Sequence, residues 1–129
     1  MNLILTGAET EVLTVHLHVM RKNIKTVLKR NYGHGEGKRL LKVYDKVKDK
    51  LKDKLEFLEA EKGFPFVFNR EELELLHSFL IVFFNKLNEE MKSKIRNNLD
   101  REKAKENMQL AYLEEVQRKV NELVGELVG

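Results

Sequence analysis

The sequence predicts an all-α protein, built as an antiparallel, up-and-down four-helix bundle. Three observations predict this fold: apolar residues recur every three or four positions, capping signals divide that pattern into segments, and a single proline interrupts it. Apolar residues make up 42% of the 129 residues and charged residues 35%, which is typical of one soluble domain over residues 1–129.

Composition also indicates the cellular compartment and excludes cysteine-based chemistry. The chain has no cysteine, which excludes disulfides and thiolate-bound metals and favours a cytoplasmic protein. No apolar run reaches the roughly 18 residues of a transmembrane helix, so we expect no membrane contact.

A first helix is expected from about residue 7 to Tyr32. Thr6 followed by Glu9 has the spacing of a capping box, in which each side chain accepts a bond from the other residue's backbone N–H. Apolar residues then follow at helical steps, namely Leu13, Leu17, Met20, Ile24 and Leu28.

Residues 13–19 leave an alternative open, because apolar and polar residues alternate there as they do in a strand. On a strand, His16 and His18 would share one face like a metal-binding pair, whereas on a helix they lie about 200° apart. The helical spacing continues past Met20 without a turn signal. We therefore favour the helix and expect no metal site.

A glycine-rich loop, Y-G-H-G-E-G-K-R, follows at residues 32–39. Its spacing matches neither a P-loop nor a dinucleotide fingerprint. We interpret it mainly as a hinge between two helices, with Gly33 as a left-handed cap. The alternative is a single phosphate or carboxylate held at the next helix N-terminus by His34, Lys38 and Arg39.

A second helix is expected from about Gly37 to Lys62. The tetrads D-K-V-K, D-K-L-K and D-K-L-E follow one another from Asp45 to Glu56, so lysine and aspartate surround a narrow apolar stripe. We expect a peripheral helix that Gly63 caps. The aromatic connector F-P-F-V-F comes next, at residues 64–68.

Asn69 with Glu72 marks the start of a third helix, which is apolar almost all round between residues 75 and 84 and is therefore central. We place a turn at residues 97–100, before a fourth helix that reaches residue 127. The alternative is that the third and fourth helices are continuous and form a long arm that dimerises.

Charge divides the chain into a basic helical hairpin (about 7–62) and an acidic, apolar helical hairpin (about 69–127). Residues 21–54 carry 13 Lys and Arg against 4 Asp and Glu, a net charge of +9, whereas residues 55–129 carry 11 against 15, a net charge of −4. Such a layout suits an anionic partner. An alternative function is therefore nucleic-acid or anion binding by the basic hairpin, through Arg21, Lys22, Lys25, Lys29, His34, Lys38 and Arg39.

Catalytic patterns are incomplete. Glu74 and His77 have the spacing of half a di-iron site, but no second Glu-x-x-His follows. We therefore expect no enzyme and no cofactor. The favoured function is a small helical regulator or inhibitor that binds another protein, with homodimerisation through the third and fourth helices a further expectation. The residues expected to bind the partner are Phe64, Phe66, Phe68, Phe79 and Phe83.

Overall fold

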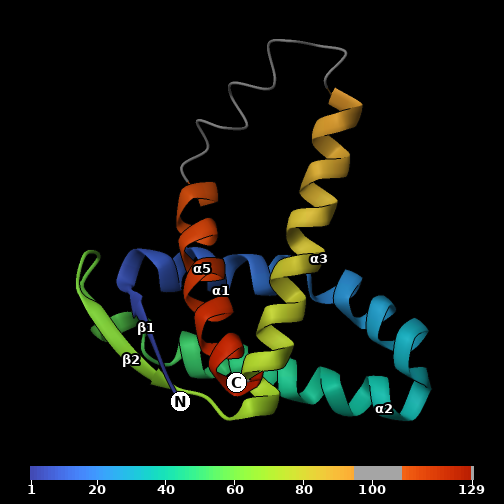
Figure 1. Cartoon of the computed structure of the whole chain (residues 1–129), viewed down its shortest axis with the longest axis horizontal. Coiled ribbons are helices and arrows are strands. Elements are labelled where there is room, and N and C mark those ends of the chain that lie inside the picture. The colour runs from blue at the N-terminus through green and yellow to red at the C-terminus, as the bar shows by residue number, and fades with distance from the viewer. Residues whose placement is uncertain (95–108, 129) are drawn as a thin grey trace.

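The computed structural model describes residues 1–94 and 109–128 (Figure 1). In chain order its elements are β1 (Asn2–Thr6), α1 (Gly7–Val19), α2 (Arg21–Lys52), the short 3-10 helix η1 (Leu55–Phe57), β2 (Gly63–Val67), α3 (Arg70–Lys94) and α5 (Gln109–Val128). The turn expected at residues 97–100, and the continuity of the third and fourth helices, lie outside the described residues.

A two-stranded antiparallel ribbon makes the prediction of an all-α bundle wrong. β1 pairs with β2, with Leu3 opposite Phe66 and Leu5 opposite Phe64. Leu3, Leu5 and Phe66 are buried, whereas Ile4 and Val67 are exposed on the other face. The alternating phenylalanines of the expected connector therefore follow the period of a strand. Pro65 is tolerated because a strand with a free edge needs no N–H there.

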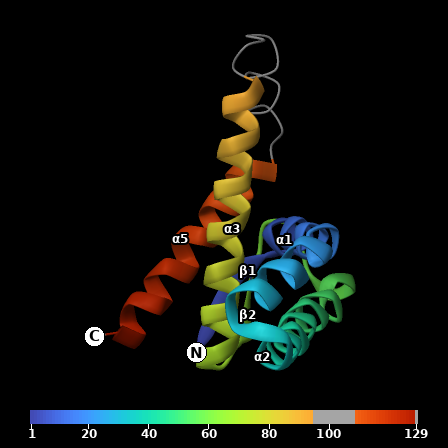
Figure 2. The same cartoon turned by 90° about the vertical axis from the view of Figure 1, so that its right-hand side faces the viewer.

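The helices form two pairs that cross, rather than four rods running up and down. In Figure 1, α3 and α5 stand upright, while α1 and the second part of α2 run across behind and below them. Figure 2 views the latter two almost end-on beside α3. Contacts join α1 to both α2 and α5, and α3 to both α2 and α5. The core lies between these helices and the inner face of the ribbon.

Several predicted helix boundaries need correction. Residues 13–19 are helical, as expected, but the first helix breaks at Met20, where φ is −88° and ψ is 1°. No glycine or proline marks this break. Met20 is buried, so packing rather than local sequence selects it.

The second helix ends at Lys52, ten residues before the expected position, and Gly63 begins β2 instead of capping a helix. The N–H groups of Gly7 and Ala8 donate to the carbonyls of Glu59 and Ala60, both at 3.1 Å. A Cβ at Gly7 would lie 2.5 Å from the Glu59 carbonyl oxygen. The segment before β2 is therefore held against the start of α1, which prevents a longer second helix.

Two halves of the chain share one pattern. The first half (β1, α1 and α2) and the second half (β2, α3 and α5) each place a strand, a capping box and a helix in sequence, followed by another helix. A shift of 63 positions relates the capping residues Thr6 and Asn69. The same shift relates the buried residues Leu3, Leu5, Leu13 and Leu17 to Phe66, Phe68, Leu76 and Leu80.

The pairing of the ribbon agrees with this repeat. Leu3 and Phe66 are equivalent under the 63-residue shift, and they also lie opposite each other in the two strands. In an antiparallel pair, such a coincidence places an approximate two-fold axis between them. The two halves are therefore related by that axis through the ribbon.

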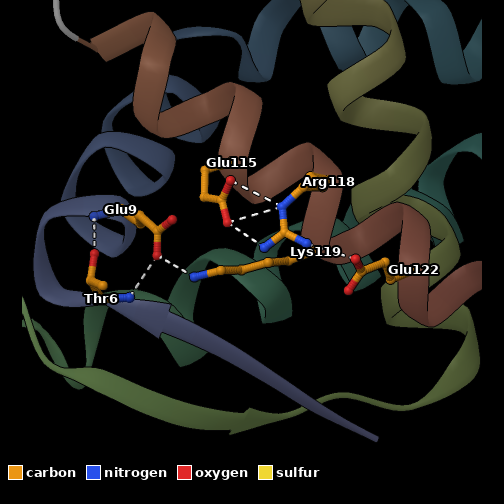
Figure 3. Close-up of polar contacts among 6 residues, drawn as sticks. All are labelled: Thr6, Glu9, Glu115, Arg118, Lys119 and Glu122. Carbon is orange, nitrogen blue, oxygen red and sulfur yellow. Dashed lines mark hydrogen bonds and ion pairs between the residues drawn. The ribbon is translucent and has the colours of Figure 1, made fainter.

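Both capping boxes form, and each is bound by a lysine from the other half. Glu9 Oε1 accepts from the Thr6 N–H at 2.8 Å and from Lys119 Nζ at 2.7 Å (Figure 3). Glu72 Oε1 accepts from the Asn69 N–H at 3.0 Å and from Lys50 Nζ at 2.7 Å. Both glutamates are buried.

The two lysines occupy corresponding places on their helices, although a shift of 69 positions, not 63, relates them. Lys50 is flanked by Val47 and Leu51 on α2, and Lys119 is flanked by Val116 and Val120 on α5. These four apolar neighbours are all buried. The second helix of each half therefore supplies the lysine that binds the capping glutamate at the start of the other half's first helix.

We expect Lys119→Met to lower the free energy of unfolding by about 2–4 kcal/mol, because it leaves a buried carboxylate without its cation. Urea denaturation at neutral pH measures the loss. Adding Glu9→Gln should restore part of it, since no charge is then buried. Arg118→Met is the matched control, because Arg118 holds its glutamates in an exposed network on the same helix. If Lys119→Met and Arg118→Met lower the free energy of unfolding equally, the buried Lys119–Glu9 pair is not the cause.

Candidate functional site

A groove of about 630 Å³ lies between α2 and the first half of α3 on the described surface. Ile24 and Leu28 of α2, together with Phe79 of α3, form its apolar floor. Its polar lining comprises Asn31, Glu36, Arg39, Glu71, Glu74, His77 and Ser78. We call this the α2–α3 groove.

The groove exists because α2 folds back on itself. Gly33 has φ 83° and ψ 174°, a non-helical conformation that divides α2 into a first arm (21–32) and a second arm (34–52). Residues other than glycine rarely adopt a positive φ. In Figure 1 the two arms form an open V at the right of the molecule. The glycine loop is therefore a hinge, as predicted, although Gly33 lies outside the left-handed helical region.

Close packing sets the base of the V. A Cβ at Gly37 would lie 3.0 Å from the carbonyl carbon and oxygen of Leu28. Only a residue without a side chain therefore lets the second arm approach the first so closely. Beyond this point, the bidentate pair of Arg21 with Asp45 joins the arms, at 2.8 and 2.9 Å. The guanidinium of Arg21 holds the pKa of Asp45 below its usual value, against the opposing effect of burial.

Tyr44 fixes the floor of the groove to the rest of the core. Its hydroxyl donates to the backbone carbonyl of Leu17, and its ring lies edge-on to Phe79 at 5.9 Å. Burial raises the pKa of Tyr44, with the charge of Asp45 as a second cause. Tyr44 therefore stays neutral and serves as a packing and hydrogen-bonding residue.

Arg39 links the rim of the groove across its two walls. Its guanidinium donates to Glu36 on α2 at 3.0 and 2.6 Å, and to Glu71 on α3 at 3.0 and 2.9 Å. The hydrogen bond from Arg39 lowers the pKa of Glu36. Since both carboxylates occupy this guanidinium, Arg39 is not presented to an anion at the glycine loop. His34 and Lys38, its expected companions, are exposed.

The other residues of the predicted basic surface divide into two kinds. Arg21 is bound to Asp45. Lys22, Lys25 and Lys29 are exposed on the first arm, and none of them pairs with a carboxylate among residues 1–89 and 110–127. The three lysines thus remain on the surface, whereas Arg21 and Arg39 form ion pairs that hold α2 in place.

The phenylalanines expected to bind a partner are largely internal. Phe66, Phe68, Phe79 and Phe83 are buried in the core, and Phe64 packs partly buried against it. Of these five, Phe79 lines the groove. The groove itself was not predicted from the sequence. The sequence did contain one indication of the groove. Val27 and Tyr32 add apolar side chains next to the buried residues of the first arm, and both line the groove.

The apolar seam expected to mediate dimerisation is also used within the chain. On α5, Val116 and Val120 are buried, whereas Leu123, Val124 and Leu127 are only partly so. The two histidines that the strand alternative would have paired are separated, with His16 edge-on to Phe83 at 5.0 Å and His18 exposed. Within the described ranges, no helix combines the length and apolar character needed to cross a membrane.

Comparison with known proteins leaves this geometry without a precedent to interpret it. No protein-family model matches the chain, and neither a curated protein nor a solved structure shows significant similarity to it. The groove and its charges therefore have to be interpreted from their own chemistry.

We expect Gly33→Ala to destabilise the protein by about 1–3 kcal/mol, because alanine is strained at this positive φ. Gly35→Ala is the matched control two residues away. A Cβ at Gly35 meets nothing within 4 Å, so this change should be neutral or stabilising by up to about 1 kcal/mol. Thermal and urea denaturation measure both changes. If the two variants lose stability equally, the turn does not depend on the conformation of Gly33.

The Arg21–Asp45 pair should contribute to stability in a pH-dependent way. Because the pKa of Asp45 is lowered in the folded state, its contribution is present above about pH 4 and is lost as pH falls through the depressed value. Asp45→Asn should cost about 0.5–1 kcal/mol at pH 7, since the pair is partly exposed. Its difference from the native chain should shrink as pH falls below about 4.

Urea denaturation from pH 7 down to pH 3 measures that difference. Asp49→Asn is the control on the same arm, because Asp49 is exposed and has no ion-pair partner in the described part of the chain. A gap between the native chain and Asp45→Asn that does not change with pH would rule out the ion pair as its cause.

Proposed function

We propose that this chain is a non-catalytic binding protein, and that its α2–α3 groove takes apolar side chains from a segment of another protein. The observation that carries this is the groove itself: about 630 Å³, with an apolar floor and a polar rim. Sites that bind compact apolar groups in proteins have roughly this size and composition. A protein that captures a segment of another blocks what that segment otherwise contacts, which supports a regulatory or inhibitory role.

Comparison of the two halves supports the same site. Both halves need a strand, a capping box and two helices to build the fold. The first half adds a break at Met20, whereas α3 continues through the equivalent of Met20, at Phe83. This break is not required by the shared pattern, and the groove lies beyond it, where α2 reverses at Gly33.

The mouth of the groove carries apolar side chains that the chain itself does not cover. Tyr32 is 56% exposed and Ile81 is 42% exposed, and both line the groove. Tyrosine at such a position favours protein recognition, because it combines a large apolar ring with a polar tip. An amphipathic helix laid along the groove would cover both residues and insert its own apolar residues between the walls.

The second candidate function is nucleic-acid binding through the basic hairpin at residues 21–54. It is supported by the exposed, unpaired Lys22, Lys25 and Lys29, which are spaced to lie on one side of the first arm. Arg21 and Arg39 are engaged with carboxylates, which leaves Arg30 as the exposed, unpaired arginine of the described hairpin for bidentate phosphate contacts. The protein partner is therefore the favoured proposal.

Selection from a displayed library of random peptides tests the favoured proposal. Peptides enriched on the native protein should share apolar residues at helical spacing. Ser78→Trp, which fills the groove, should weaken them by about tenfold or more, equivalent to about 1.4 kcal/mol. Binding is measured by fluorescence anisotropy with synthetic versions of the enriched peptides.

Thr26→Trp is the control, because Thr26 is exposed and lies on the opposite side of the first arm from Ile24 and Leu28. It adds the same side chain outside the groove and should leave binding unchanged. The proposal fails if no such peptides are enriched, or if enriched peptides bind Ser78→Trp as well as they bind the native protein.

A further inference from the structure

The charge around the α2–α3 groove is strongly one-sided. α2 carries 12 Lys and Arg against 3 Asp and Glu over residues 21–52, a net charge of +9. This helix forms two of the three walls of the groove. A ligand that approaches the groove therefore enters a positive field.

The carboxylates on the rim offset only part of this field, because two arginines neutralise two of the three. Glu36 and Glu71 both accept from Arg39, and Glu74 accepts from Arg70 at 3.0 Å. By contrast, no carboxylate of the described residues lies within ion-pair distance of five exposed lysines of α2, namely Lys25, Lys29, Lys38, Lys42 and Lys46. The positive excess of α2 therefore lies on lysines outside the residues that line the groove.

Helical spacing places several of these lysines beside the groove. Lys25 and Lys29 each follow a floor residue, Ile24 or Leu28, by one position, which turns them toward the edge of the first arm. Lys42 and Lys46 follow Arg39 by three and seven positions, so they continue the stripe that Arg39 begins on the second arm. Both arms therefore carry free ammonium groups beside the groove rather than among its lining residues.

We infer that the segment taken by the groove is an acidic amphipathic helix, with apolar residues on one face and Asp or Glu along its flanks. This inference rests on the proposed function and specifies its partner. The apolar face fills the groove, and the flanking carboxylates meet the lysines of the two arms. Nucleic acid supplies the negative charge but offers no aliphatic side chains for the floor, so it would contact the lysines and leave the apolar floor uncovered.

The lysines would act mainly on specificity and on the rate of association. Each exposed ion pair contributes little free energy, because water and salt screen it. Several together repel basic segments and attract acidic ones. The preference for an acidic helix should therefore be large at low salt and should decline as salt is added.

Two labelled peptides of about 16 residues, long enough to span four helical turns, test this. Both carry leucines at the same three- and four-residue spacing. One has glutamates on its flanks and the other has lysines at the same positions. Fluorescence anisotropy over a salt series should show the glutamate peptide binding the full chain about tenfold more tightly or better at low salt, with the ratio shrinking at high salt.

A charge-reversal variant ties the preference to these lysines. Lys25→Glu with Lys29→Glu should remove or invert the preference. Lys52→Glu with Lys54→Glu changes the net charge equally beyond the groove and should retain most of the preference. Circular dichroism confirms that each variant is folded before its binding is measured.

The outcomes separate this inference from the proposed function. If neither peptide binds at low salt, the proposed function and the inference both fail. If both bind equally, or the lysine peptide binds more tightly, the groove remains a binding site but the acidic partner is excluded. Labelled duplex DNA is the third probe: if it binds while the glutamate peptide does not, the basic hairpin is a nucleic-acid surface and the inference is overturned.

Discussion

Two buried glutamates hold the structure together, because each joins a helix end in one half to a lysine in the other. Glu9 and Glu72 satisfy the backbone N–H of their own capping residues and also bind Lys119 and Lys50. A buried carboxylate without a cation is strongly unfavourable. Neither half can therefore adopt its native conformation independently without exposing its capping glutamate or leaving it unpaired.

These two ion pairs between the halves are consistent with the crossing of the helices. The second helix of each half has to reach the capping box of the other half, and the two boxes lie beside a common ribbon whose centre is the pair Leu3–Phe66. Lys50 also donates to the carbonyl of Val67 at 3.2 Å, so a side chain occupies part of the edge of β2. An edge covered in this way is protected against pairing with another strand.

The groove arises within the first half, where α2 folds back on itself. The break at Met20 and the reversal at Gly33 turn one long helix into a V, and Gly37 and the Arg21–Asp45 pair hold its two arms in place. Arg21 and Arg39 are used to fix this shape, while Lys25, Lys29, Lys38, Lys42 and Lys46 are exposed and unpaired within the described part of the chain. Shape and charge thus come from different residues of the same helix, which allows each to be tested separately by mutation.

The sequence by itself determined the helical character of most of the chain, both capping boxes and the buried seams, because these depend on residues within about four positions of one another. It also located the hinge, since three close glycines permit a reversal. Only the tertiary structure decided that F-P-F-V-F is a strand, because that depends on pairing with residues some 60 positions earlier. The break at Met20 and the end of α2 at Lys52 likewise follow from packing. The groove could not be foreseen for the same reason: its walls come from three segments that only folding brings together.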